Sequence, residues 1–387
     1  MKIYNRLCDA KMTPIALVCF VLFLNCKNSP TKTEQPVTTS QELAGQMPNK
    51  DSSKNTIHYP AEKHLKNVKQ LTFGGNNAEA YWSFDGKMLV FQSDNPAWGA
   101  ECDQIYYFNP DLDDLSKNKP HYISRRGGRT TCSYFMPGDS MIIFASTHRD
   151  TSACPPVPER TTGGKYVWPI YSSFDIYVAD LKGNLKKQLT NIAGYDAEAT
   201  VSPKGNKIIY TALRQGDLNL WIMDIDGKNK KQITFLPGYD GGAFFSPDGN
   251  SIVFRASRPK DSEARKEYYE LLQKGLVQPT EMEIFTCNLQ GGNYHQVTNL
   301  GKANWAPFYH PSGKKIIFSS NHAAPKGYQF NLYLINLDGT GLEQITFDSV
   351  FDSFPMFSPD GKRLVWASNR NNGGTHDTNL FMAEWVD

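Results

Sequence analysis

Polar and charged side chains recur at two equivalent positions along the chain, and their types could support ligand binding. One set precedes an apolar run and is acidic or neutral: Asn77, Thr130, Asp196, Asp240, Asn304 and Asp352. The other set follows a later apolar run and is mainly cationic or imidazole: Asn95, His148, Arg214, Arg258, His322 and Arg370. Arginine could bind a carboxylate through two parallel N–H donors, because its guanidinium group is planar. Four further side chains could line the same site, at the mouth of the channel that a ring of repeats would enclose: Glu79, Tyr166, Glu198 and Trp305.

Two other interpretations of these residues stay open. The aspartates and arginines could pair with each other and tie neighbouring repeats together, without any ligand. His148 and His322 could instead bind a metal with acidic partners, but they would lie opposite each other across a ring of six repeats. The sequence contains no CxxC or HxxxH spacing, predicts no cofactor and leaves metal binding undecided.

Motifs of catalysis are absent from the sequence. There is no GxSxG nucleophile motif, no HExxH motif and no glycine-rich phosphate loop after a strand. The Gly-Gly pairs, 241–242 among them, are assigned to turns or loops. A pair of carboxylates at the mouth could still cleave a glycan, since an acid and a base can come from distant segments. The residues therefore favour a binding protein, with a saccharide or peptide hydrolase or lyase as the alternative.

A repeated unit must position these residues. The stretch FFSPDGNSIVF at 244–254 has close relatives at 82–91, 201–210, 309–318 and 357–366. Each joins two apolar runs by a Gly-containing turn, and a second strand signal (such as NLYLIN) and a polar one (such as LEQIT) follow. The pattern occurs six times, at spacings such as 44 residues from Gln188 to Gln232. Propeller blades have about 40–45 residues, so we predict an all-β, six-bladed propeller of four-stranded antiparallel blades.

The ends of the chain predict how the ring closes. The polar strand signal VKQLT at 68–72 precedes any innermost strand, and the chain ends three residues after NLFMAE at 379–384. The N-terminal strand is therefore expected to complete the sixth blade, which would remove the open sheet edges.

Three long connections predict the face that binds. They span 94–103, 147–174 and 259–282, and strand alternation places all three on the face opposite the repeated turns. The third contains a short helical stretch, EARKEYYELLQKGL, in the fourth blade, in which Leu271, Leu272 and Leu276 could pack. We expect this helix to lie over the mouth of the channel or beside it.

The N-terminal segment indicates export. Residues 1–25 combine basic residues with the short apolar run IALVCFVLFL, which is typical of a signal peptide of the lipoprotein type. Cys26 is the expected lipidation site, residues 26–57 are an expected flexible tether and the propeller spans 58–387. Export permits one disulfide among Cys102, Cys132 and Cys154, with the pairing undetermined. Charge is balanced, with 41 basic and 39 acidic side chains, which argues against a nucleic-acid partner.

The repeats resemble those of a known family. The segments FFSPDGNSIVFRASR at 244–258 and FSPDGKRLVWASNR at 357–370, and the sequence NLYLINLDGTGLEQIT, are similar to the β-propeller repeat of TolB proteins, over about residues 64–387. The resemblance implies a periplasmic protein of the Gram-negative envelope. Lys27, after the expected lipidation site Cys26, resembles the common sorting pattern of lipoproteins in the outer membrane, where we expect the lipid anchor. TolB also carries an α/β domain before its propeller, and here only a tether precedes it. The sequence thus predicts a propeller that binds an envelope protein, peptide or glycan through its loop-rich face.

Overall fold

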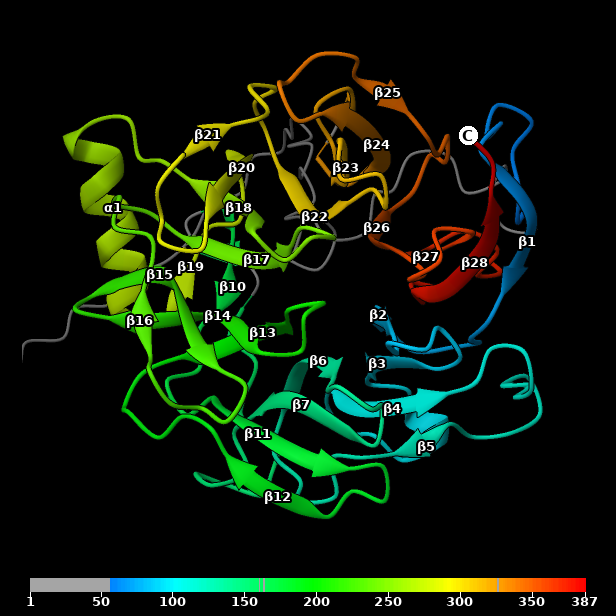
Figure 1. The fold of residues 1–387 in the computed structure, drawn as a ribbon, viewed down its shortest axis with the longest axis horizontal. Coiled ribbons are helices and arrows are strands. Elements are labelled where there is room, and N and C mark those ends of the chain that lie inside the picture. The colour runs from blue at the N-terminus through cyan, green and yellow to red at the C-terminus, as the bar shows by residue number, and fades with distance from the viewer. Residues whose placement is uncertain (1–55, 160, 163, 326) are drawn as a thin grey trace, which may run out of the picture. The chain divides into compact units, whose positions relative to one another are not determined.

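The computed structural model describes residues 56–159, 161–162, 164–325 and 327–387. The expected signal peptide, Cys26 and all but the last two residues of the expected tether lie outside the described residues. Six four-stranded antiparallel sheets follow one another around a ring (Figure 1), which confirms the six-bladed propeller.

The strands take equivalent places in the six blades. The innermost strands are β2 (Asn77–Trp82), β6 (Thr130–Phe135), β13 (Asp196–Val201), β17 (Asp240–Phe245), β22 (Asn304–Tyr309) and β26 (Asp352–Phe357). The second strands are β3 (Leu89–Ser93), β7 (Met141–Ser146), β14 (Lys207–Arg214), β18 (Ser251–Ser257), β23 (Lys315–Ser320) and β27 (Arg363–Ser368). The third strands are β4 (Gln104–Phe108), β11 (Asp175–Asp180), β15 (Asp217–Asp224), β20 (Met282–Asn288), β24 (Asn331–Asn336) and β28 (Asn379–Trp385). The outermost strands are β5 (His121–Tyr122), β12 (Leu185–Gln188), β16 (Lys231–Gln232), β21 (His295–Gln296), β25 (Glu343–Gln344) and β1 (Leu65–Gln70).

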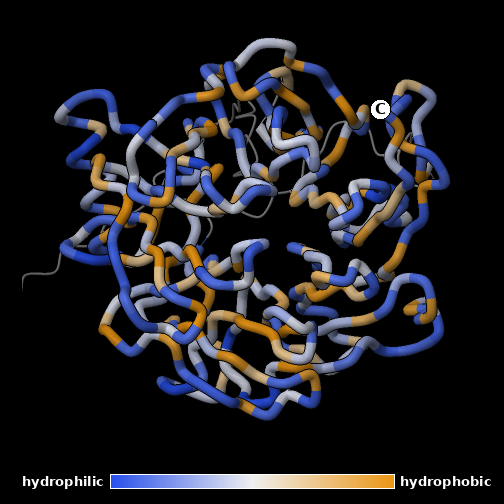
Figure 2. Tube along the Cα trace, in the orientation of Figure 1, coloured by the Kyte–Doolittle hydropathy of each residue, from blue (hydrophilic) through white to orange (hydrophobic). Residues whose placement is uncertain are grey.

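The second and third strands are almost continuously apolar because neighbouring blades cover both faces of each sheet. In the fourth blade, for example, Ile252, Val253 and Phe254 are all fully buried. Figure 2 shows apolar residues along the blade strands and hydrophilic residues in most connections at the perimeter. Burial of these runs is the main source of the ring's stability.

The repeated turn has a local cause. In the fourth blade the hydroxyl of Ser246 accepts a hydrogen bond from the N–H of Ser251 at 2.9 Å, and the carboxylate of Asp248 accepts one from the N–H of Asn250 at 3.1 Å. Gly249 follows with a φ of 64°, which a residue with a Cβ adopts only with strain. The motif thus satisfies its own backbone and joins the innermost strand to the second strand. This role is structural.

The N-terminal strand closes the ring, as the sequence predicts. β1 pairs with β28 in the sixth blade, with Leu65 opposite Trp385 and Gln70 opposite Phe381. Just before β1, the side chain of Glu62 is buried and meets Arg370, which follows β27. Strand pairing and a buried ion pair therefore fasten the first described segment to the last blade.

The helix predicted in the fourth blade is α1 (Ser262–Gln273). Its first turn is capped by Asp261, whose carboxylate accepts a hydrogen bond from the N–H of Ala264 at 2.8 Å. Leu271 and Leu272 are buried, and the hydroxyl of Tyr268 donates to Asp217 of β15 at 2.7 Å. The helix therefore lies beside the ring, at the outer edge next to the third blade (Figure 1), and not over the channel.

Two long connections pair with each other. β10 (Trp168–Pro169), from the second-blade connection, pairs with β19 (Leu276–Val277), which follows α1. Just before β10, β8 (Thr161–Thr162) and β9 (Lys165–Tyr166) form a small hairpin. The first-blade connection contains a short 3-10 helix, η1 (Pro96–Trp98). None of the helices in the described part of the chain is long and apolar enough to cross a bilayer.

Candidate functional site

Each innermost strand carries the same bulge, and this bulge positions the residues that face the channel. Pairing with the second strand is interrupted after the second residue, between Ala78 and Tyr81 in the first blade, for example. The third residue then has a positive φ in all six strands: Glu79 (55°), Cys132 (48°), Glu198 (58°), Gly242 (58°), Ala306 (47°) and Phe354 (55°). A bulge re-aims a side chain. We call these six residues the channel ring.

Glu198 of the channel ring forms a buried ion pair with Arg255 of β18. The guanidinium Nη2 of Arg255 lies 2.6 Å from Oε1 of Glu198 and 2.7 Å from the hydroxyl of Tyr239. Glu198 also accepts hydrogen bonds from Thr211 at 2.7 Å, from Tyr239 at 2.5 Å and from the N–H of Gly242 at 2.8 Å. The pair joins the third blade to the fourth and places a fixed positive and negative charge at the channel.

Two glycines make room for this pair. Gly241 and Gly242 lie within β17, so their assignment to a turn or loop was wrong. A Cβ on Gly241 would overlap the carboxylate of Glu198, and one on Gly242 would overlap the guanidinium of Arg255. The backbone of the fourth blade therefore approaches the charged groups more closely than any other residue type would allow.

The two carboxylates of the channel ring have different proton affinities. Burial raises the pKa of Glu79 to about 7; the negative charge of Glu198 adds to this rise, while Cys132 and Arg255 oppose it. Burial alone would also raise the pKa of Glu198, but Arg255 and the hydrogen-bond donors outweigh burial and hold that pKa below its ordinary value. Of these two carboxylates, Glu79 is therefore the one that can gain or lose a proton near neutral pH.

Replacing Glu79 with glutamine is expected to change how stability depends on pH. The folded-state pKa of Glu79, about 7, lies above its ordinary value of 4.5, so the folded protein holds a proton that the unfolded chain releases. This contribution to stability is present below the ordinary pKa and is lost as pH rises to about 7. Between about pH 5 and 8, urea unfolding should show that the wild type loses roughly 2–3 kcal/mol more than Glu79→Gln.

The control for this measurement is Glu263→Gln, which removes an exposed carboxylate at the start of α1. Its unfolding free energy should follow the wild type across the same pH range. Parallel curves for Glu79→Gln and the wild type would contradict a raised pKa at Glu79.

The aspartates and arginines that the sequence places at the mouth pair with each other. Arg214 meets both carboxylate oxygens of Asp196 at 2.7 Å. Asp240 with Arg258 and Asp352 with Arg370 repeat the arrangement, at 2.5 and 2.8 Å. Each pair lies within one blade, and the three aspartates are fully buried. These contacts match the alternative of mutual pairing, except that each pair joins two strands of one blade and not two blades.

The first residues of the innermost strands also contact the preceding blade. The N–H of Asp196 donates to the carbonyl of Phe174 at 3.0 Å, and the N–H of Asp352 donates to that of Phe330 at 2.9 Å. Asn77 does the same with Thr378 at 2.8 Å. This set therefore lies at the seams between blades.

The two histidines occupy similar, separate environments. His148 lies 2.9 Å from the hydroxyl of Ser146, and His322 lies 3.0 Å from that of Ser320. Burial lowers the pKa of both imidazoles, and nearby cationic side chains lower it further. Across the described ranges, no group of three His, Cys, Asp or Glu side chains is placed to hold a metal ion.

Aromatic side chains from two connections and from the innermost strand β22 meet on the loop-rich face. Trp168 of β10 lies 5.0 Å from Trp305 of the fifth blade, between ring centroids, and 5.5 Å from the guanidinium of Arg255. Tyr166 lies 6.1 Å from Tyr328, which is 50% exposed. We call Tyr166, Trp168, Trp305 and Tyr328 the entrance cluster. Sequence reasoning placed Tyr166 and Trp305 near the mouth but missed Trp168, Tyr328 and Arg255.

Trp305 links the cluster to the insertion of the fourth blade. Its indole N–H donates to the carbonyl of Pro279 at 2.7 Å, and its ring stacks on Phe330 with centroids 4.3 Å apart. Both contacts fix the orientation of the indole. The entrance cluster is therefore supported by the second, fourth and fifth blades.

The opposite end of the channel holds an apolar cavity of about 210 Å³. All six blades contribute to its lining, with Phe84, Phe244 and Phe308 among the aromatic residues and Pro247 and Pro359 from the repeated turns. The cavity lies on the turn-rich face, where the sequence predicts no site.

One disulfide joins two of the long connections. It links Cys102 to Cys154, one of the pairings that the sequence leaves open. Cys132, the third candidate, is a free and buried thiol in the channel ring.

Comparison with known proteins identifies the repeat. The family model described as the TolB beta propeller domain matches residues 166–264 and 277–376. No curated protein matches the chain.

Comparison with solved structures finds three similar chains. A putative TolB from Agrobacterium tumefaciens has a TM-score of 0.52 at 20% identity, covering 81% of this chain and 91% of that one. TolB from Acinetobacter baumannii has a TM-score of 0.48 at 17% identity, covering 80% and 63%. An oligogalacturonate lyase in complex with manganese has a TM-score of 0.47 at 14% identity, covering 83% and 93%. At these identities the likeness concerns the fold alone.

Proposed function

Because the chain belongs to the TolB beta-propeller family, we propose that it is a binding protein that receives a segment of a partner protein on its loop-rich face. The observation that carries the proposal is the entrance cluster, in which the second-blade and fifth-blade connections bring aromatic side chains to Trp305 of β22 beside the channel. Tyr, Trp and Arg are the residue types that contribute most to protein interfaces. Half-exposed Tyr328 can pack against an apolar group of the partner, and the fixed ion pair of Arg255 and Glu198 can orient a polar group.

We place the protein in the cell envelope of a Gram-negative bacterium, on the periplasmic side. The signal of residues 1–25 and the cysteine at position 26 support export and lipidation, and residue 27 is lysine, which favours the outer membrane. A disulfide between Cys102 and Cys154 is consistent with an oxidising compartment. The partner is accordingly an envelope protein or a peptide segment of one.

The proposal is tested by affinity capture with matched variants. The full chain, held in detergent, is immobilised and exposed to solubilised envelope from the source bacterium, and retained proteins are identified by mass spectrometry. A partner should bind the wild type and bind Tyr328→Ala and Trp168→Ala at least roughly tenfold more weakly, when measured again with the purified partner.

The control is Leu112→Ala, which removes an apolar side chain that is 82% exposed, on the turn-rich face. It should retain the partner as the wild type does. Equal affinity of the purified partner for all four proteins would refute the entrance cluster as the binding site. Tyr328→Ala matters most, because its exposed side chain can be removed with little effect on folding.

One observation favours the enzymatic alternative. The raised pKa of Glu79, about 7, suits a general acid or base at neutral pH. However, Glu198 is held by four donors and cannot act as a second proton carrier without breaking them. We therefore favour the binding function over the enzymatic one. If the wild type turned over a saccharide or peptide, and the folded Glu79→Gln variant did not, the enzymatic function would be favoured instead.

A further inference from the structure

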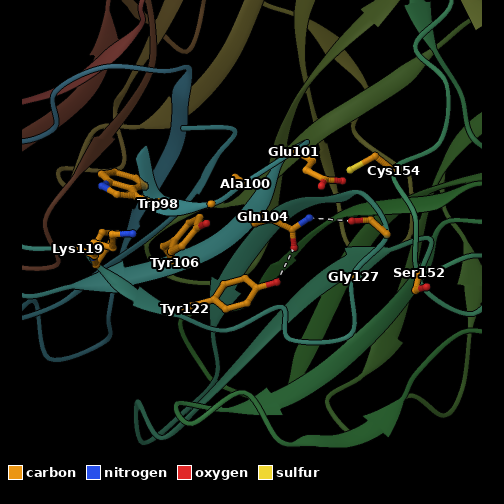
Figure 3. A pocket seen from close by; sticks show the side chains of 13 residues that line it. Trp98, Ala100, Glu101, Gln104, Tyr106, Lys119, Tyr122, Gly127, Ser152 and Cys154 are labelled. Carbon is orange, nitrogen blue, oxygen red and sulfur yellow. Dashed lines mark hydrogen bonds between the residues drawn. The ribbon is translucent and has the colours of Figure 1, made fainter. Parts of the chain in front are cut away.

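A second cavity lies away from the channel, on the loop-rich side of the first two blades. Its volume is about 250 Å³. It is lined by Trp98 of η1, Tyr106 of β4 and Tyr122 of β5, and by loop residues that include Glu101 and Lys119. Figure 3 shows aromatic rings along one wall and polar groups around them. None of the residues discussed for the channel or the entrance cluster lines this cavity.

The aromatic wall is held in place from behind. Trp98 packs edge-on against Phe91, at 5.9 Å between centroids, and against Tyr106, at 5.4 Å. The turn that carries Trp98 is fixed by Asn95, whose side chain accepts from the N–H of Ala97 at 2.9 Å and donates to the carbonyl of Gly74 at 2.8 Å. Trp98 is thus preorganised while part of its surface remains exposed.

The disulfide forms the other side of the cavity. Cys154 lines it together with Ser152, and the bond to Cys102 attaches this stretch of the second-blade connection to the first blade. Gln104 fills the floor: its amide N–H donates to the carbonyl of Gly128 at 2.7 Å, and its oxygen accepts from Ser124 at 2.8 Å. The floor and the wall therefore keep their shape without a ligand.

Two charged side chains at the cavity have no hydrogen-bond partner among the described residues, unlike Gln104 at its floor. Glu101 and Lys119 are both exposed, and neither has a hydrogen bond or an ion pair with any residue in the described part of the chain. Figure 3 places them on opposite sides of Gln104. The cavity thus offers a rigid aromatic wall together with a carboxylate and an ammonium group that are free to contact a ligand.

We propose that this cavity binds one sugar unit of a glycan. A sugar ring has an apolar C–H face that can lie on an aromatic ring, and hydroxyl groups around its edge that both donate and accept hydrogen bonds. Glu101 can accept from hydroxyls, and Lys119 can donate to a hydroxyl or to a carboxylate. An aliphatic peptide side chain would cover the aromatic wall but would form no hydrogen bond with either charged group.

The size of the cavity agrees with this ligand. Pockets for drug-sized ligands have about 300–1,000 Å³, so this smaller volume suits a single sugar unit, with the rest of the glycan in solvent. The site does not depend on the proposed partner at the entrance cluster, since no residue is shared. Together the two sites would let the propeller hold a glycan and a protein on the same face.

The test is saturation-transfer NMR on the full chain in detergent. The probes are the methyl glycosides of a neutral hexose, an N-acetylhexosamine and a hexuronic acid, with the dipeptide Gly-Leu as the peptide probe. At least one glycoside should bind saturably below roughly 10 mM, as expected of a single-sugar site. Preference for the hexuronic acid would assign Lys119 to its carboxylate.

Variants connect the signal to the cavity. Trp98→Ala should weaken binding roughly tenfold or more, whereas Trp98→Phe should retain most of it. Glu101→Gln and Lys119→Ala should each weaken binding several-fold, and both are exposed, so their folding is not in question. The control is Lys314→Ala, an exposed lysine outside the cavity, which should bind as the wild type does.

Two outcomes would overturn the proposal. One is that no glycoside binds saturably, or that only the dipeptide does. The other is that a glycoside binds equally to the wild type, Glu101→Gln and Lys119→Ala, which would place the sugar elsewhere on the protein.

Discussion

Replacing Arg370 with methionine is expected to lower the free energy of unfolding by roughly 3–5 kcal/mol, because it leaves several buried carboxylates without their cation. The guanidinium group is fully buried and meets Glu62 at 2.9 Å, Asp352 at 2.8 Å and Asp348 at 3.4 Å. Glu62 precedes the closing strand, and Asp352 begins the innermost strand of the same blade. The substitution therefore weakens the point at which the ring closes.

The loss should depend on pH. In the variant, protonation is the remaining way to neutralise the buried carboxylates, so the gap between wild type and variant should narrow as pH falls from about 8 to 5. Urea unfolding at both pH values measures the gap. A loss below about 1 kcal/mol, or a gap that is the same at both values, would contradict the closure role.

Arg258→Met is the matched control, because Arg258 occupies the equivalent position in the fourth blade. It meets a single carboxylate, that of Asp240, and its side chain is 24% exposed. The expected loss is less than half that of Arg370→Met, since solvent can reach the remaining charge. The comparison distinguishes the closure network from the simple Asp–Arg pairing that the third and fourth blades also have.

The fold could be predicted from the sequence because the strands and turns of each blade are specified by residues close together in the chain. Each blade has its own turn, such as Ser246 with Asp248 and Gly249, and its own apolar runs, so six copies give the same information six times. The closing strand was also predictable, since an outermost signal at 68–72 has no blade of its own at the start of the chain. The position of α1 was not predictable, because it depends on a contact of Tyr268 with Asp217 in another blade.

The site was harder to predict, and particular residues show why. The mouth pairs could have been recognised from spacing: Asp196 and Arg214, like Asp352 and Arg370, are 18 residues apart, which is the span of one hairpin. Arg255 could also have been recognised, because it is a charged residue within an otherwise mostly apolar strand. Its partner Glu198 belongs to the preceding blade, 57 residues earlier, and only the geometry of the ring brings the two together.

Replacing Arg255 with methionine is the second change with a large expected effect, again roughly 3–5 kcal/mol. Arg255 is 7% exposed, and removal of its guanidinium group leaves the Glu198 carboxylate buried with only neutral donors. The pKa of Glu198 should rise as a result, so the variant should lose more stability at about pH 8 than at pH 5. The pKa of Glu79 should rise as well, because Arg255 is among the groups that lower it.

The double variant Arg255→Met with Glu198→Gln distinguishes an ion pair from simple packing. If the two side chains only fill space, their separate losses should add in the double variant. If the charge left behind is the main cost, Glu198→Gln should restore part of the stability lost in Arg255→Met, by roughly 1–3 kcal/mol. Restoration is expected, because glutamine keeps an acceptor oxygen for Thr211 and Gly242, can donate its amide N–H to the hydroxyl of Tyr239, and removes the buried charge. A double variant less stable than Arg255→Met alone would contradict this expectation. It would mean that the three neutral donors stabilise the carboxylate of Glu198 without Arg255, and that the loss in Arg255→Met has a cause other than an unpaired buried charge.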